Sequence, residues 1–171
     1  MNFNNFTIKS QEAVQKAVEI TSANGQQAIE PVHLLKGVVD VGESLVNYIF
    51  QKLGVNVNLL KTAVDREIAS LPKVSGGEPY LSREANAVLQ KASDYSSKMG
   101  DQFVALESIL MALLQTKSSA SSFMKDAGIN EKELGAAIDE LRKGQSVKDA
   151  SAEDTYNALS KYAINLNERA R

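Results

Sequence analysis

The sequence contains no cysteine and only one histidine, His33. Without cysteine there can be neither a disulfide framework nor thiolate metal ligands, and one imidazole cannot supply the several ligands that a metal site needs. Any serine-histidine-aspartate arrangement would have to use His33, which stands in an apolar stretch and is expected to be a hydrogen-bonded core residue. The glycines also fit no phosphate-cradling or dinucleotide pattern. We therefore expect no catalytic site, metal or cofactor in this chain.

The sequence also lacks an excess of positive charge and lacks long apolar runs. The net charge is -2 and the isoelectric point is near 5.5, whereas a nucleic-acid surface needs a clustered basic face. No window approaches about 18 uninterrupted apolar residues, and the first residues lack the basic-then-apolar pattern of a signal peptide. We expect a protein that binds neither nucleic acid nor membrane. The absence of cysteine fits a cytoplasmic location.

What the sequence does contain is one pattern used twice. Residues 6–39 and 81–114 align without a gap at an offset of 75, and Gly54-Val55-Asn56 then aligns with Gly128-Ile129-Asn130 at an offset of 74. Each copy is about 65 residues long, a size at which an isolated domain buries too little surface to be more than marginally stable. The two copies are therefore expected to share one core.

Apolar residues recur at helical spacing in both copies, and no stretch shows sustained alternation. We expect an all-α fold without a sheet, in which two tandem pseudo-symmetric four-helix repeats (residues 6–72 and 80–144) pack into one domain. Thr7 is a plausible N-cap of the first helix, Asn58 of the fourth and Asn130 of the last, and Pro31 suits a first helical turn. Residues 73–79 read as a short linker.

After residue 144 the chain turns polar, and Ser151 with Asp154 offers another helix start. The residues beyond place an apolar stripe on one face of a helix: Tyr156, Leu159, Tyr162, Ala163 and Leu166. This stripe has no partner within either repeat. We expect that the chain is a fragment of a longer protein or that this face docks elsewhere.

Among many carboxylates, Asp101 and Glu107 stand out because they flank an apolar segment ahead of the second buried helix of the second repeat. Their counterparts in the first repeat are Gln26 and Val32, so the shared fold does not demand these charges. Helix capping and a functional role both remain open for the pair.

Two motifs resemble the N-terminal domain of the Clp ATPases. They are Ile29-Glu30-Pro31-Val32-His33-Leu34-Leu35 in the first copy and Gly100-Asp101-Gln102-Phe103 with Glu107 in the second. Within that family the chain is most similar to ClpB-type disaggregases. The resemblance covers essentially the whole chain, and it implies a Clp N-terminal domain at residues 1–144. Residues 145–171 would then be a linker to a first ATPase module outside this chain.

The resemblance implies a substrate-engaging domain without enzymatic activity in a homohexameric disaggregase that works with a DnaK-type chaperone. ATP and Mg would bind to the missing modules, and the isolated domain would be a monomer. Unfolded or aggregated polypeptides would bind weakly in an apolar groove beside the first helix of the second repeat, presented by Val88 and Leu89. Lys91 stands where relatives can be apolar, so this groove is expected to be narrower or more polar here.

The family positions linked to substrate handling match Thr7, Asp101 and Glu107. From the sequence, alanine at Asp101 or Glu107 is expected to leave helicity and melting nearly unchanged while altering substrate handling. An alternative is an adaptor- or degron-binding domain of a Clp protease unfoldase. A receptor for phosphorylated arginine would want acidic groups in both copies, and the candidates, Glu30 and Glu107, do not align. A third possibility is an unrelated helical-repeat scaffold.

Overall fold

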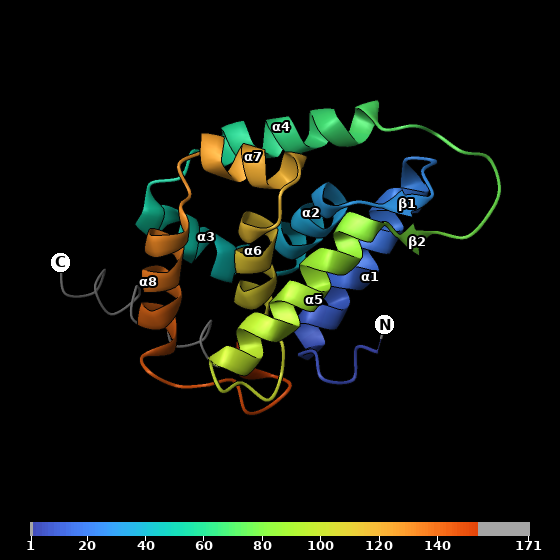
Figure 1. Ribbon diagram of the computed structural model, residues 1–171. Coiled ribbons are helices and arrows are strands. Elements are labelled where there is room, and N and C mark those ends of the chain that lie inside the picture. Colours follow the sequence, from blue (N-terminus) through green and yellow to red (C-terminus); the bar gives the residue numbers. More distant parts are fainter. Residues whose placement is uncertain (1, 154–171) are drawn as a thin grey trace.

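A computed structural model describes residues 2–153 of the 171-residue chain (Figure 1). Eight α-helices and two short strands lie within these residues. They are α1 (Ile8–Ala23), β1 (Ala28–Ile29), α2 (Pro31–Val41), α3 (Glu43–Leu53), α4 (Val57–Ser70), β2 (Tyr80–Leu81), α5 (Arg83–Lys98), α6 (Leu106–Gln115), α7 (Ser119–Asp126) and α8 (Glu131–Arg142). The helices α1–α4 and α5–α8 form the two predicted four-helix units, so the all-helical repeat fold is confirmed. The helix predicted to start at Ser151 shows helical backbone at Ala152 and Glu153, and the apolar stripe predicted from Tyr156 onward lies outside the described residues.

The expectation of no sheet is wrong in one small respect. Strands β1 and β2 pair in parallel, with Ala28 opposite Tyr80 and Ile29 opposite Leu81, and a separate bridge joins Phe6 to Val104. The 75-residue offset makes Phe6 the counterpart of Leu81 and Ile29 the counterpart of Val104. In each unit, therefore, the residue two positions before the first helix pairs with the residue two positions before the second helix of the other unit. Two-residue strands are too short for alternation to reveal them.

The helix starts largely follow the predicted caps. Thr7 accepts a hydrogen bond from the backbone N–H of Ser10 at 3.1 Å, and Asn130 accepts one from that of Glu133 at 2.9 Å. Pro31 is the first residue of α2. The cap of α4 is Asn56 and not Asn58, because Asn56 is the residue with extended backbone whose side chain reaches the N–H of Leu59. This matches Asn130, its counterpart at an offset of 74.

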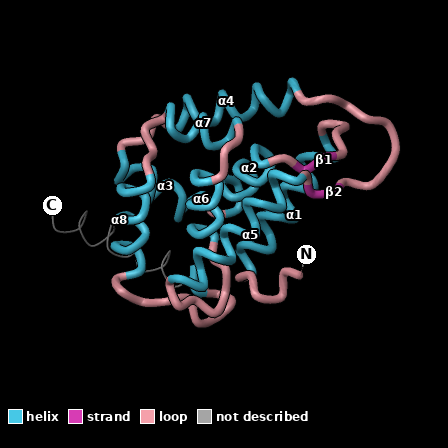
Figure 2. Tube along the Cα trace, in the orientation of Figure 1, coloured by secondary structure: helices cyan, strands magenta, loops and turns pink. Residues whose placement is uncertain are grey.

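One continuous core joins the two units. Helix α6 is buried along most of its length near the middle of the molecule, and α3 packs against α8 while α4 packs against α7 across the two units (Figure 2). Helices α1 and α2 approach closely at Gly37, where a Cβ atom would lie 2.4 Å from the carbonyl oxygen of Ala13. The shared core is what two marginal halves require.

Candidate functional site

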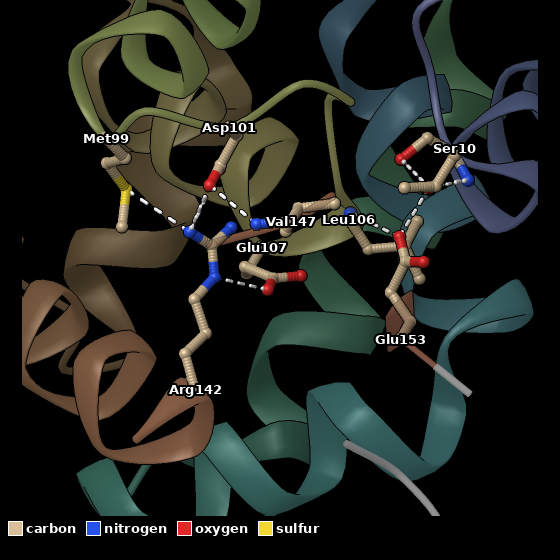
Figure 3. Close-up of polar contacts among 9 residues, drawn as sticks. Ser10, Met99, Asp101, Leu106, Glu107, Arg142, Val147 and Glu153 are labelled. Atoms are coloured by element: carbon tan, nitrogen blue, oxygen red, sulfur yellow. Dashed lines mark hydrogen bonds and ion pairs between the residues drawn. The ribbon is translucent and has the colours of Figure 1, made fainter. Parts of the chain in front are cut away.

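Asp101, Glu107 and Arg142 form a buried charged cluster (Figure 3). Asp101 lies in the loop after α5, Glu107 is the second residue of α6, and Arg142 is the last residue of α8. Arg142 Nε lies 2.9 Å from Glu107 Oε2, and Arg142 Nη1 lies 2.9 Å from Asp101 Oδ2. The three side chains are 0–2% exposed. The structure thus places one cation between the two carboxylates that the sequence singled out.

This cluster gives Asp101 and Glu107 a structural role. Asp101 Oδ1 also accepts a hydrogen bond from the backbone N–H of Val147 at 2.9 Å, which ties the segment after α8 to the loop after α5. Removing either carboxylate would leave part of a buried cation without its partner, which is strongly destabilising. We therefore revise the expectation that alanine at these positions leaves the melting behaviour unchanged. Any part that the two residues play in substrate handling stays a prediction.

Thr7 belongs to a second buried contact, formed with Glu153 (Figure 3). The Thr7 hydroxyl and the Glu153 carboxylate are hydrogen-bonded, and the backbone N–H of Leu106 donates to Glu153 Oε2 at 3.1 Å. Burial, together with the negative charge of Glu107, raises the pKa of Glu153 from 4.5 to about 7. Neither Glu153 nor Arg142 was singled out from the sequence, because their partners are distant along the chain.

The remaining predicted site residues, Val88 and Leu89, are both fully buried in the core. Neither side chain is available to a ligand in this conformation, and a role in substrate binding stays a prediction. The surface beside them does hold a hollow of about 360 Å³. Apart from Tyr95 its lining is polar or charged: Lys91, Asp94, Lys98, Gln115 and Glu131. Lys91 lines this polar hollow, and the narrower or more polar substrate groove beside α5 stays a prediction.

An apolar groove lies instead in the first unit, between α2, α3 and α4. Its volume is about 260 Å³, and it will be called the first-unit groove. Six apolar residues line it, namely Leu35, Val39, Phe50, Val57, Leu60 and Val64, together with four charged ones, Lys36, Asp40, Lys61 and Asp65. Lys36 forms an ion pair with Asp65 at 2.5 Å. The groove thus has an apolar floor and a charged rim without a net charge.

The second unit shows why this groove is open. At the repeat offsets, Lys36 corresponds to Met111 and Lys61 to Gly135. Met111 is 3% exposed, and its methyl group lies 3.8 Å from the position that a Cβ of Gly135 would take. A flexible thioether side chain suits such gap filling. In the first unit two lysines take these places, and their amino groups stay near solvent instead of filling the groove.

His33 has the structural role expected from the sequence. Its side chain is fully buried; Nδ1 accepts a hydrogen bond from the backbone N–H of Glu30 at 2.9 Å, and Nε2 lies 2.8 Å from Gln26 Oε1. The amide of Gln26 in turn donates to the carbonyl of Ile68. His33 therefore links the start of α2 to the end of α4. Burial lowers the pKa of His33 from 6.5 to about 4.

This shift predicts a pH dependence of stability. The unfolded chain takes up a proton at His33 below about pH 6.5, whereas the folded chain resists it until about pH 4. The contribution of His33 is thus complete above pH 6.5 and is lost as the pH falls toward 4, by roughly 3 kcal/mol. Because His33 is the sole histidine, its ring signals in NMR spectra report the titration directly. A midpoint near 6.5 in the folded protein would contradict the assignment.

The described residues contain no group of histidine, cysteine, aspartate and glutamate side chains suited to hold a metal ion. Within residues 2–153, none of the helices combines the length and the hydrophobicity needed to span a bilayer.

Comparison with known proteins places the chain in a family. Residues 5–127 match the model of the Clp repeat (R) N-terminal domain. The chain is 65% identical over all its 171 residues to chaperone protein ClpB of Bacteroides thetaiotaomicron, and 58% identical over the same length to that of Porphyromonas gingivalis. In both cases it spans 20% of the relative's length.

Solved structures agree on the fold. The N-terminal domain of Hsp104 from Candida albicans superposes with a TM-score of 0.77 at 22% identity, covering 88% of this chain and 99% of that one. The N-terminal domain of ClpD from Arabidopsis thaliana gives a TM-score of 0.64 at 24% identity, covering 83% and 97%. The Clp repeat N-terminal domain that the chain matches is not a catalytic domain. The chain therefore belongs to the Clp repeat N-terminal domain family, as an N-terminal domain of the chaperone type.

Proposed function

We propose that this domain engages unfolded or aggregated polypeptides weakly, and that the first-unit groove receives their apolar side chains. The observation that carries the proposal is the groove itself, a hollow between α2, α3 and α4 at the place where the second unit buries Met111. Val57 is the half-buried apolar residue at its mouth, and the other apolar lining residues lie buried at its floor. A volume of about 260 Å³ accommodates one or two large apolar side chains. The charged rim carries two cations and two anions, so it favours no particular sign of charge in the bound segment.

The small size of the groove limits the affinity for an unfolded polypeptide. Burying one or two large apolar side chains of the client, together with the small apolar surface of the groove, removes a few hundred square ångströms from water, which at about 25 cal/mol per Å² gives several kcal/mol. Because association itself opposes much of this, the expected Kd lies in the roughly millimolar to tens of micromolar range. Weak contact without sequence preference suits a client that has no fixed structure.

The ATPase activity and the action with a partner chaperone would come from a longer protein that contains this domain. We propose that it is a homohexameric, ATP-driven disaggregase that acts with a DnaK-type chaperone, and that ATP and Mg bind in modules outside this chain. Six copies of a weak domain around one ring would raise the capture of a large client by avidity. The cytoplasm is the expected location.

The alternative of a receptor for phosphorylated arginine has less support. Its candidate acidic group in the second unit, Glu107, already faces the guanidinium of Arg142 at 2.9 Å and is fully buried. A second guanidinium would have to displace Arg142 from the core. In the first unit, Glu30 occupies the N-cap position of α2.

The proposal is tested by NMR titration of the 171-residue chain with a permanently unfolded protein, using a folded protein of similar charge as the control. Fast-exchange shifts around Val39, Val57 and Leu60 with the unfolded protein only would support the first-unit groove. Shifts confined to Lys91 and Tyr95 would move the site to the hollow beside α5. An absence of shifts would argue for an adaptor-binding domain instead.

A further inference from the structure

The segment after α8 returns across the domain instead of leaving it. This C-terminal strap, residues 144–153, buries Val147 and Ala152 in the shared core. The backbone N–H of Gln102 donates to the carbonyl of Val147 at 2.8 Å, and that of Ile8 donates to the carbonyl of Ala150 at 2.9 Å. The strap is thus bound to the loop after α5 and then to the first residue of α1.

Glu153 makes the last described contact of the strap. Its Oε2 atom bonds to the hydroxyl of Thr7, the N-cap of α1, and accepts from the N–H of Leu106, the first residue of α6. The residue is 2% exposed. One carboxylate therefore bridges the N-terminal ends of two helices that belong to different units. Helix N-termini present free N–H groups and favour acceptors and negative charge.

The hydrogen bonds at Thr7 accommodate the carboxyl group in both protonation states. Thr7 Oγ1 has three partners: the N–H of Ser10, the hydroxyl of Ser10 and Glu153 Oε2. A hydroxyl donates once and accepts twice. When Glu153 is ionised, it accepts a hydrogen bond from the Thr7 hydroxyl, and the Ser10 hydroxyl donates to Thr7. When Glu153 is protonated, it donates to the Thr7 hydroxyl, which in turn donates to the Ser10 hydroxyl. No bond has to break when the proton arrives.

The surroundings of Glu153 oppose its negative charge. Glu107 on α6 is fully buried, although Arg142 faces its other side. Asp40 of α2 and Glu43 of α3 line a cavity of about 210 Å³ next to Glu153, and Lys9 of α1 is the cation among the lining residues. Among the residues that the structure describes, none bonds to Glu153 Oε1. An ionised Glu153 is therefore buried beside more negative than positive charge, and no hydrogen bond from the described residues reaches its Oε1 atom.

We propose that Glu153 is a proton-linked latch that holds the C-terminal strap on the N-termini of α1 and α6, and that loss of its proton favours release of the strap. The strap is then fixed against α1 and α6 when the latch is closed and free of them when it is open. The attachment of the strap to the domain would thus respond to pH near neutrality.

The direction of the pH dependence follows from the pKa of Glu153 in the released and docked states of the strap. A released Glu153 has the ordinary pKa near 4.5, whereas burial beside Glu107 raises the pKa of the docked group to about 7. Docking is therefore strongest below pH 4.5 and weakens as the pH rises from 4.5 to 7, after which it changes no further. Between pH 6 and pH 8 the docking constant is expected to fall by about tenfold.

The test is amide hydrogen exchange in the 171-residue chain at pH 6 and pH 8, corrected for intrinsic rates. The amide of Ile8 reports the docked strap because it bonds to Ala150, and the amide of Leu110 in α6 reports global unfolding. The protection of Ile8 is expected to fall by about tenfold at the higher pH while Leu110 stays far better protected, because the strap opens without global unfolding. In Glu153→Gln, whose amide resembles the protonated carboxyl, this change is expected to shrink below about twofold.

Two further variants separate a latch from a merely structural residue. Glu153→Lys is expected to abolish the protection of Ile8 at both pH values while Leu110 stays protected. Glu12→Gln makes the same charge change as Glu153→Gln at an exposed site of α1 and is expected to keep the wild-type pH dependence. Equal protection of Ile8 at both pH values in the wild type would overturn the proposal. So would an unchanged pH dependence in Glu153→Gln, or the loss of all protection at Leu110 in Glu153→Lys.

Discussion

Replacing Arg142 by methionine is expected to lower the free energy of unfolding by about 3–5 kcal/mol. Methionine keeps much of the buried length of the side chain but removes the cation, so Asp101 and Glu107 would be left as buried carboxylates without their shared partner. Urea unfolding followed by circular dichroism measures the change.

The control for this variant is Lys132→Met, which removes an exposed cation from the same helix and is expected to change stability by less than about 0.5 kcal/mol. A double-mutant cycle of Arg142→Met with Glu107→Gln isolates the pair and is expected to show a coupling of about 1–3 kcal/mol. If Arg142→Met were as mild as Lys132→Met, the charged cluster would contribute nothing to the fold. Asp101 and Glu107 would then again be free for substrate handling.

Leu110→Ala is expected to destabilise the domain by about 2–5 kcal/mol. Leu110 is 1% exposed and lies in the middle of α6, which contacts helices of both units. Truncation removes apolar contacts and leaves a cavity that α6 cannot close without moving against both units at once. The same urea unfolding experiment measures the loss.

Leu59→Ala serves as its counterpart, because Leu59 is 50% exposed on α4 and its truncation is expected to matter by less than about 0.5 kcal/mol. A loss below about 1 kcal/mol at Leu110 would show that α6 is not the centre of the shared core.

The fold could be predicted from the sequence because the signals that define it are local or periodic. Helical spacing, the caps Thr7 and Asn130, and the repeat offsets all lie in short stretches of chain. The cap of α4 was misassigned because Asn56 and Asn58 are both good caps, and only the backbone conformation separates them. The parallel pairing of Ile29 with Leu81 gave no signal, because it joins two-residue strands from different units.

The candidate site was less predictable, because its contacts join distant residues. Asp101 and Glu107 were identified, but Arg142 reads in the sequence as an ordinary cation in the last turn of a helix, where the dipole favours one. Glu153 likewise reads as a residue at a helix start. Val88 and Leu89 lie at apolar positions with helical spacing, and their complete burial follows that spacing. The first-unit groove depends on Lys36 and Lys61 standing where the second unit has Met111 and Gly135, a difference visible only once the helices are placed.

The central claim is that unfolded polypeptides bind in the first-unit groove, and the most direct measurement is their affinity for two matched variants. Val57→Glu places a carboxylate in the groove at the first position of α4, where the second unit has Glu131 and where negative charge suits the helix. Asn58→Glu introduces the same charge one residue further on, at an exposed position that does not line the groove. Val57→Glu is expected to weaken binding at least about fivefold, measured by NMR titration, while Asn58→Glu leaves it within about twofold. Equal affinities for the two variants would contradict binding in the first-unit groove.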